Sequence, residues 1–250
     1  RQMCIRDRYN SKYQGFTPPT RPTAYAETGV GLVEIYWDDI SEHGSDVLTG
    51  YNDFEGYKIY KSLDGGATWG SASDRIYDAD GLFVGWHPYK QFDLSAEEDS
   101  LHCVYSNNYD CDRSQRRNHS ISGPDPYFPW FNLGYDTGLD IIRLDESEWK
   151  IIDGITYKYM FLDDDVTDGI EYTYSVVAYD MGVEPTYVKS YKPIGNGQFE
   201  TVIDTNFSNP NEWANPEGYA SIENSKGTTI LDRNFVQVYP GVKPQINLDK

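Results

Sequence analysis

Four aspartates lie close together in the second half of the chain, and carboxylates at this density could hold a hard cation. Asp163, Asp164 and Asp165 are consecutive, and Asp168 follows three positions later. Such carboxylates repel one another unless a cation or solvent screens them, and calcium takes oxygen ligands of this kind. The spacing does not follow an EF-hand loop. Two interpretations stay open: a solvated acidic turn, or a calcium site formed by Asp163, Asp165 and Asp168.

Aromatic residues in the middle of the chain could stack against sugars. Trp86 is followed, near residue 130, by the run D-P-Y-F-P-W-F, which contains Tyr127, Phe128 and Trp130. Amphipathic rings on a loop suit the faces of sugar rings, but the same rings could also form a small core of their own. Exposed, coplanar rings would favour ligand binding, and buried rings would favour the second interpretation.

Two cysteines are separated by seven residues. In an oxidising compartment Cys103 and Cys111 would suit a disulfide that closes a small loop, worth about 2–3 kcal/mol if unstrained. Free thiols are the first alternative. A zinc site is the second, with His102 and His119 nearby, but this spacing is no recognised finger pattern.

The chain contains no catalytic motif that we recognise. H-E-x-x-H, G-x-S-x-G, the P-loop and G-x-G-x-x-G are all missing, and the four histidines fall in separate polar segments. The many carboxylates leave a glycoside hydrolase pair conceivable, but nothing singles one out. We therefore predict that the chain is not an enzyme, with a hydrolase fragment as the remaining alternative.

Composition excludes two classes of partner. The 250 residues include 21 basic and 40 acidic side chains, so the formal net charge is −19. A surface this negative repels phosphate backbones, and nucleic acid is not an expected partner. No run of about 18 apolar residues exists, so we predict no membrane span.

The clearest structural pattern is residues 169–180, G-I-E-Y-T-Y-S-V-V-A-Y-D. Tyr172, Tyr174, Val176 and Ala178 alternate with the intervening residues, and this period of two predicts a half-buried β-strand. Similar alternation predicts further strands at residues 30–37, 54–62, 155–161 and 234–239. A short strand at 82–86 and a helix start within 94–101 are also expected.

Several of these strands resemble those of a fibronectin type III domain. The run V-T-D-G-I-E-Y is similar to the family's E–F corner, the I-x-W at residues 35–37 to strand B, and F-E-G-Y-K-I-Y-K-S to strand C. The resemblance implies that Tyr172 is the tyrosine corner, with its ring in the core and its hydroxyl bonded to nearby backbone. It also implies that Trp37 and Tyr57 are core residues.

The implied fold is all-β: a fibronectin type III/immunoglobulin-like β-sandwich with large loop insertions. Some ninety residues separate the expected strands C and E, far more than the family has, so part of this gap should have its own order. The expected division of the chain is 1–8 a sequencing artefact, 9–23 a linker, 24–62 strands A–C, 63–154 an insertion, 155–180 strands E–F, 181–233 an irregular loop insertion, 234–240 strand G, and 241–250 an exit linker.

Residues 62–69, S-L-D-G-G-A-T-W, match the Asp-box pattern of sialidase-like propellers, S-x-D-x-G-x-x-W. In that family the motif is a hairpin turn held by its Asp and Trp, here Asp64 and Trp69, and it lies away from the active site. Because D-G-G is also ordinary hairpin chemistry, we predict a plain or Asp-box-like turn and no enzymatic role.

The amino-acid sequences of these strands resemble those of domains that precede sorting modules in bacterial proteins exported by type IX-type secretion. This implies an extracellular or cell-surface location. The expected function is a non-catalytic spacer or adhesion module, with other domains of the same polypeptide, a polysaccharide or a surface protein as partners. No cofactor is expected, with a calcium ion as the alternative. The alternative is a carbohydrate-binding module attached to a glycoside hydrolase, which would use the aromatics of residues 63–154.

Overall fold

The computed structural model describes residues 17–44, 54–77, 81–95, 98, 137–180, 188–195, 198–204 and 221–241. Within these residues the protein is all-β, as predicted: its strands pair antiparallel, and its only helices are three short 3₁₀ turns. No helix in the described residues has the length and apolar composition needed to cross a membrane.

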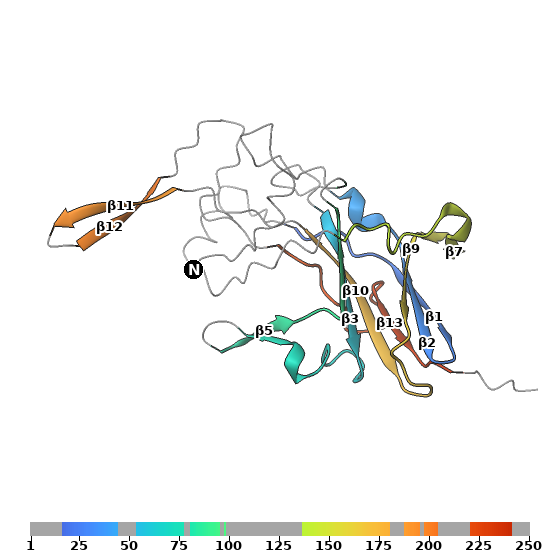
Figure 1. Cartoon of the computed structure of the whole chain (residues 1–250). Helices are drawn as coiled ribbons and strands as arrows, with labels where there is room; N and C mark the ends of the chain where they lie inside the picture. Colours follow the sequence, from blue (N-terminus) through green and yellow to red (C-terminus); the bar gives the residue numbers. More distant parts are fainter. Residues whose placement is uncertain are drawn as a thin grey trace, which may run out of the picture.

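Two sheets make up the centre of the molecule (Figure 1). The first has the order β1-β2-β9, formed by β1 (Ala24–Gly29), β2 (Leu32–Trp37) and β9 (Tyr159–Asp163). The second has the order β13-β10-β3-β6, formed by β13 (Phe235–Val238), β10 (Tyr172–Asp180), β3 (Phe54–Ser62) and β6 (Lys90–Asp93). Three further pairs are β4 (Arg75–Tyr77) with β5 (Phe83–Trp86), β7 (Lys150–Ile152) with β8 (Ile155–Tyr157), and β11 (Val188–Gly195) with β12 (Gln198–Asp204). The 3₁₀ turns are η1 (Ile40–His43), η2 (Ala72–Asp74) and η3 (Glu146–Glu148).

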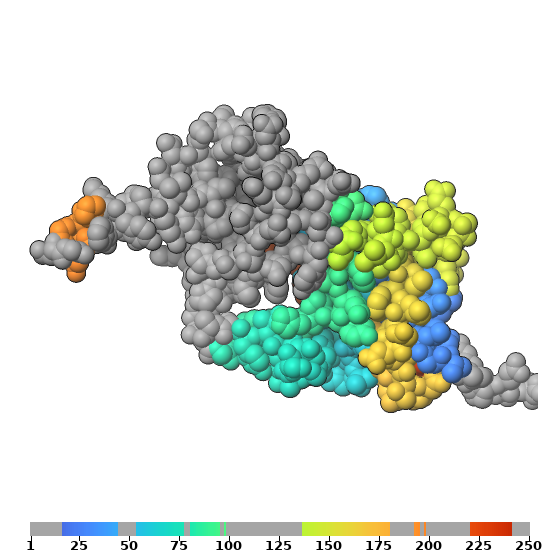
Figure 2. All heavy atoms as spheres, viewed as in Figure 1, coloured from blue at the N-terminus to red at the C-terminus, as the bar shows by residue number. Residues whose placement is uncertain are grey.

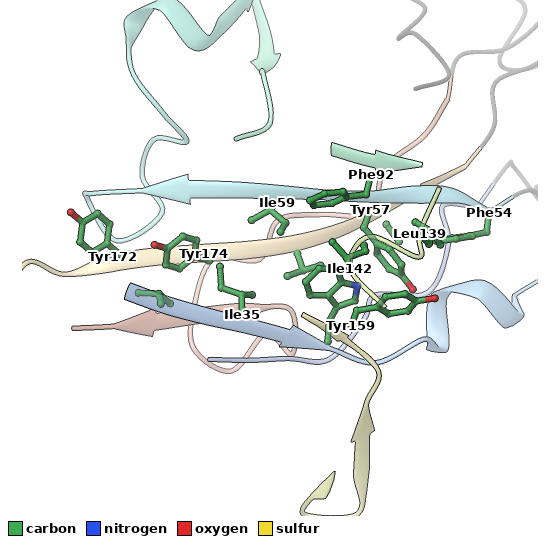
Figure 3. Close-up of a cluster of buried hydrophobic side chains, with 14 residues drawn as sticks. Ile35, Phe54, Tyr57, Ile59, Phe92, Leu139, Ile142, Tyr159, Tyr172 and Tyr174 are labelled. Atoms are coloured by element: carbon green, nitrogen blue, oxygen red, sulfur yellow. The ribbon is translucent and has the colours of Figure 1, made fainter. Parts of the chain in front are cut away.

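The two central sheets share one hydrophobic core. Alternate residues of β2 (Val33, Ile35 and Trp37) are fully buried, because successive side chains of a strand point to opposite faces. They meet inward residues of β3 and β10 from the other sheet. Figure 3 shows the cluster, in which the labelled side chains are Ile35, Phe54, Tyr57, Ile59, Phe92, Leu139, Ile142, Tyr159, Tyr172 and Tyr174.

Residues 172–180 form the predicted strand, but the prediction that this strand is half-buried is wrong, because β10 is buried on both faces along its whole length. Its second face carries Val177, which packs with Tyr60, Trp69 and Phe235 in a separate apolar cluster. Residues that precede and follow β10 in the chain therefore cover its second face, which the alternation predicted to face solvent.

The segment 63–154, expected to be an insertion, also supplies parts of the central fold. Its strand β6 pairs with β3, with Tyr57 opposite Phe92, and its residues Leu139 and Ile142 lie in the shared core. The expected helix start is described only in part. Ser95 and Glu98 exchange the reciprocal hydrogen bonds of a capping box, in which each side chain accepts from the other residue's backbone N–H.

Two further segments differ from expectation. The predicted strand 155–161 is divided at Lys158, whose N–H donates to the carbonyl of Trp37, so that β8 pairs with β7 while β9 pairs with β2. The segment 181–233, expected to be irregular, contains the β11–β12 hairpin. Asn196-Gly197 between these strands is a favoured hairpin dipeptide, a signal in the sequence that would have predicted the turn.

Candidate functional site

The β4–β5 hairpin presents aromatic rings at the surface. Tyr77 and Phe83 are 51% and 50% exposed, and Trp86 is half-buried because it packs against the cluster that contains Trp69. The Tyr77 and Phe83 ring centroids are 6.2 Å apart at 73°, and those of Phe83 and Trp86 are 5.3 Å apart at 69°. The three rings therefore form an edge-to-face series that runs from the interior to solvent. Figure 2 shows the teal segment that includes this hairpin on the surface of the molecule.

Arg75 lies on the same hairpin, beside the aromatic rings. It lies opposite Trp86 in the strand register, and its guanidinium carbon is 5.2 Å from the centroid of the Trp86 ring. A guanidinium over an indole face is a cation–π contact, and it leaves the exposed N–H groups of Arg75 able to donate to a ligand. Tyr77 and Phe83 are exposed, but the three rings are not coplanar, so they suit a ligand of irregular shape rather than a flat surface.

Trp86 is the only predicted ligand-binding residue that the described part of the chain contains. Tyr127, Phe128 and Trp130 lie outside the described residues, as do Cys103 and Cys111. Sequence analysis missed Tyr77 and Phe83. Two short apolar runs, Ile76-Tyr77 and Leu82 to Trp86, flank the turn-like D-A-D-G of residues 78–81, and this was the signal that could have paired them as a hairpin.

The Asp163 carboxylate, one of the three calcium candidates, is fully enclosed by donors. Its side chain has no exposed surface, and one oxygen accepts from Lys61 at 2.8 Å and from the Tyr174 hydroxyl at 2.6 Å. The other oxygen accepts from the Tyr89 hydroxyl at 3.0 Å and from the backbone N–H of Asp165 at 3.1 Å. Burial, and next the hydrogen bond to Asp163, raise the pKa of Tyr89 far above its ordinary value.

The structure does not bring the three calcium candidates together. Asp165 contributes its carbonyl oxygen, which accepts from Lys61 at 2.6 Å, and Asp168 accepts the backbone N–H of Gly31 at 2.7 Å. In the parts of the chain that are described, no three His, Cys, Asp or Glu residues form a group that could hold a metal ion. The aspartates instead connect β9 and the following turn to four other segments, those of Lys61, Tyr89, Tyr174 and Gly31.

The three predicted structural residues lie in the core. Trp37 and Tyr57 are fully buried, and their ring centroids are 5.6 Å apart across the two sheets. Tyr172 is also buried, and its hydroxyl oxygen accepts the backbone N–H of Thr167, five residues upstream, at 2.9 Å. This is the geometry that the name tyrosine corner describes.

The Asp-box-like turn is held by its own side chains. Asp64 accepts from the backbone N–H of Thr68 at 2.8 Å and from the Thr68 and Ser62 hydroxyls, each at 2.7 Å. These hydrogen bonds, led by that of the Thr68 backbone, lower the pKa of Asp64. Trp69 anchors the turn, because its ring packs edge-on against Tyr60 and Phe235.

Two carboxyl groups at η1 have pKa values that shift in opposite directions. Burial raises the pKa of Glu42, whose carboxylate accepts the Tyr57 hydroxyl at 3.0 Å. Burial also acts to raise the pKa of Asp39, but hydrogen bonds from Lys158 and His43 outweigh it and lower that pKa. Such a pair can serve as acid and base in catalysis, and it also arises where a fold merely buries one carboxyl group and pairs the other.

The incoming segment before β1 is bonded to the sheets. The Thr23 N–H donates to the Asp38 side chain at 2.9 Å, and the Asp38 N–H donates to the Thr23 carbonyl at 3.2 Å. Ser41 and Asn224 donate to carbonyls of the segment, at 2.7 Å to Thr20 and 3.2 Å to Pro19. Residues 19–23 are therefore fixed beside the start of β1.

The outgoing segment after β13 is fixed in the same way. The Gly241 N–H donates to the carbonyl of Gly29 at 2.8 Å, and the Gly169 N–H donates to the carbonyl of Pro240 at 2.9 Å. Gly29 is the last residue of β1, so the chain leaves at the end of β1 opposite to the incoming segment. In Figure 1 the red segment that follows β13 reaches the β1–β2 turn.

Comparison of the chain with protein-family models, with curated proteins and with solved structures finds no match in any of the three. The contacts described above are therefore the basis for a proposed function.

Proposed function

We propose that this chain is a non-catalytic spacer or adhesion module of a larger extracellular or cell-surface polypeptide, with a fibronectin type III-like sandwich fold. The strand orders support the fold proposal. Labelled along the chain, β1, β2 and β9 correspond to strands A, B and E of such a sandwich, and β3, β10 and β13 to strands C, F and G. The Tyr172–Thr167 hydrogen bond at the start of β10 is a second supporting feature.

The observation that carries the spacer proposal is the attachment of both ends of the described fold. The incoming segment is held at Thr23 and the outgoing segment at Gly241, on opposite ends of β1. At about 3.3 Å per residue, a strand of this length separates the two points by roughly 17 Å. A module whose chain enters and leaves at opposite, fixed ends transmits position and force between the segments on either side.

The polar groups of the interior support a non-catalytic module. Asp163 is paired with Lys61, and Glu223 is paired with Lys58 at 3.0 Å and with Lys226 at 2.5 Å. Each of these carboxylates joins strands or loops that are distant in sequence. We place the module outside the cell because its strands resemble those of exported bacterial proteins, and its strongly acidic composition is compatible with that location.

A distance measurement between the two fixed segments tests the spacer proposal. Spin labels would be attached at Thr17→Cys and Tyr239→Cys in the full chain, with Cys4, Cys103 and Cys111 replaced by serine. Pulsed electron paramagnetic resonance should give one narrow distance distribution. Ser41→Ala and Asn224→Ala together, which remove the donors to the Thr20 and Pro19 carbonyls, should broaden it without loss of the β-sheet circular dichroism. A broad distribution before those substitutions would contradict the proposal.

Carbohydrate binding is the second candidate, and the half-exposed rings of the β4–β5 hairpin favour it. Because Tyr77, Phe83 and Trp86 meet edge to face, a soluble glycan is a better ligand than a flat crystalline one. Affinity electrophoresis through gels that contain soluble polysaccharides would test this. Retardation should disappear in Phe83→Ala and persist in Leu231→Ala, which removes a side chain that is 91% exposed at another turn. Unchanged mobility across the panel would exclude binding to those glycans.

A further inference from the structure

Lys61 and Asp163 form the one ion pair between described residues whose carboxylate is fully enclosed. The Lys61 nitrogen is 2.8 Å from an oxygen of Asp163, and the Asp163 side chain has no exposed surface. The carboxylates of the other ion pairs between described residues all retain exposed surface, from 19% to 87%. An amino group is therefore held in contact with a carboxyl group from which water is excluded.

The neighbours of this ion pair fix both of its groups. The Lys61 nitrogen donates to the Asp165 carbonyl at 2.6 Å and lies 4.7 Å from the centroid of the Tyr89 ring. Tyr174 donates at 2.6 Å to the Asp163 oxygen that faces Lys61, and Tyr89 donates to the other oxygen at 3.0 Å. Burial, and next the hydrogen bond to Asp163, raise the pKa of Tyr174 far above its ordinary value, so its hydroxyl stays a donor.

We propose that Lys61 and Asp163 condense to an amide, which is a covalent cross-link between β3 and β9. First, one proton passes from the ammonium group to the carboxylate, and this removes two charges that are costly to hold away from water. The amine nitrogen then attacks the carboxyl carbon, and the bond from that carbon to the oxygen that faces Tyr174 breaks. This oxygen leaves as water, with the proton that it took up and a second proton from the nitrogen. The reaction needs no oxidant, reductant or other co-reactant.

The surroundings of the ion pair favour this condensation. Groups that are fixed in contact react as if they were highly concentrated, and the exclusion of water opposes the reverse hydrolysis. The Tyr89 hydroxyl and the backbone N–H of Asp165 donate to the oxygen that becomes negative during the attack. Tyr174 donates to the oxygen that leaves. Each polar step of the reaction therefore has a donor already in place.

The cross-link goes beyond the proposed spacer function, which depends only on hydrogen bonds at the two ends of the described fold. Lys61 lies in one central sheet and Asp163 in the other, so the amide would keep the two sheets joined when the chain is pulled. The pair of Lys58 with Glu223 lacks these conditions. Glu223 also pairs with Lys226, and its side chain is 25% exposed, so we expect no condensation there.

Mass spectrometry of the full chain, folded and then reduced and denatured, tests the proposal. The protein should be lighter than its sequence mass by one water, and trypsin should release one branched peptide that contains both Lys61 and Asp163. Lys61→Arg keeps the positive charge but has no amine to react, so it should have the full sequence mass. Lys58→Arg is the matched control and should still lack one water. Tyr174→Phe should slow the loss of water at least about tenfold.

Two results would overturn the proposal: the full sequence mass in the unsubstituted chain, or a missing water without the branched peptide. The second result would indicate a succinimide at an Asp-Gly pair such as Asp168-Gly169, which leaves Lys61 open to trypsin. The peptide map of the unsubstituted chain needs no variant, so it decides the matter even if a substitution prevents folding. Neither result bears on the distance between Thr17 and Tyr239, so failure here is distinguishable from failure of the spacer proposal.

Discussion

The ammonium group of Lys61 lies 2.8 Å from the carboxylate of Asp163, and this ion pair joins strand β3 of one sheet to strand β9 of the other. The Lys61 side chain retains 13% exposure, whereas that of Asp163 has none. Lys61 also lies over the rings of Tyr89 and Tyr172, with its nitrogen 4.7 and 5.0 Å from their centroids. The pair therefore combines Coulomb attraction, hydrogen bonds and cation–π contacts at one end of the core.

Substitution of Lys61 should be more destabilising than substitution of its partner. Lys61→Met leaves the enclosed Asp163 carboxylate without its counter-charge, and we expect a loss of about 3–5 kcal/mol in the free energy of unfolding. Asp163→Asn keeps an acceptor for the Tyr174 hydroxyl, and leaves Lys61 bonded to the Asp165 carbonyl and near solvent. We expect a loss of about 1–2 kcal/mol for that change. Urea denaturation of both variants measures the difference, and the reverse order would contradict this account.

Removal of the Tyr172 hydroxyl should cost stability without disturbing the core. In Tyr172→Phe the ring stays, but the Thr167 N–H loses its acceptor, and we expect about 1–3 kcal/mol of destabilisation. Tyr77→Phe is the matched control, because its half-exposed side chain should give a change within about 0.5 kcal/mol. Equal thermal midpoints for Tyr172→Phe and the unsubstituted protein would show that this hydrogen bond contributes nothing.

The second apolar cluster should depend on Trp69. Trp69→Ala removes the ring that packs against Tyr60 and Phe235 and covers the outer face of β10, and we expect a loss of about 3–5 kcal/mol. Guanidinium denaturation followed by tryptophan fluorescence measures this loss. An effect within about 0.5 kcal/mol, the range of exposed positions, would mean that the hydrogen bonds of the turn hold it without Trp69.

Glu42 should make stability decrease as the pH rises. Because the fold raises its pKa, the folded protein binds this proton more tightly than the unfolded chain does. Its contribution is full below the unfolded pKa of about 4.3 and is lost as the pH rises through the folded value. Glu42→Gln should therefore be more stable than the unsubstituted protein at pH 7, and this gain should shrink toward pH 4.

Glu223 is the matched opposite case. Its pKa is lowered: burial acts to raise it, but the charges of Lys58 and Lys226 outweigh burial. The group stabilises the fold above its unfolded pKa, and this stability is lost as the pH falls through the folded value. Glu223→Gln should therefore destabilise the protein at pH 7 and have little effect at acid pH. Parallel pH profiles of the two variants would show that neither carboxyl group is coupled to folding as described.

Much of the local structure follows from the sequence alone. The alternation of Val33, Ile35 and Trp37 identifies the inward face of β2, because side chains of a strand alternate with a fixed period of two. The spacing of Ser62, Asp64 and Trp69 identifies a turn, because every hydrogen bond of Asp64 closes within a few residues. Patterns whose contacts are local can be read from neighbouring residues.

Contacts between distant segments decided the rest. The aspartates near residue 163 predict either a solvated turn or a cation site, but Asp163 is buried because Lys61 and Tyr89 reach it from other segments, Tyr89 from 74 positions away. The same holds for the outer face of β10, where Trp69 and Phe235 cover Val177. The joining of Tyr77, Phe83 and Trp86 depends on the pairing of β4 with β5. The sequence determined which residues need burial or a partner, and only the tertiary structure decided which partner each one meets, because that choice depends on chain closure over long separations.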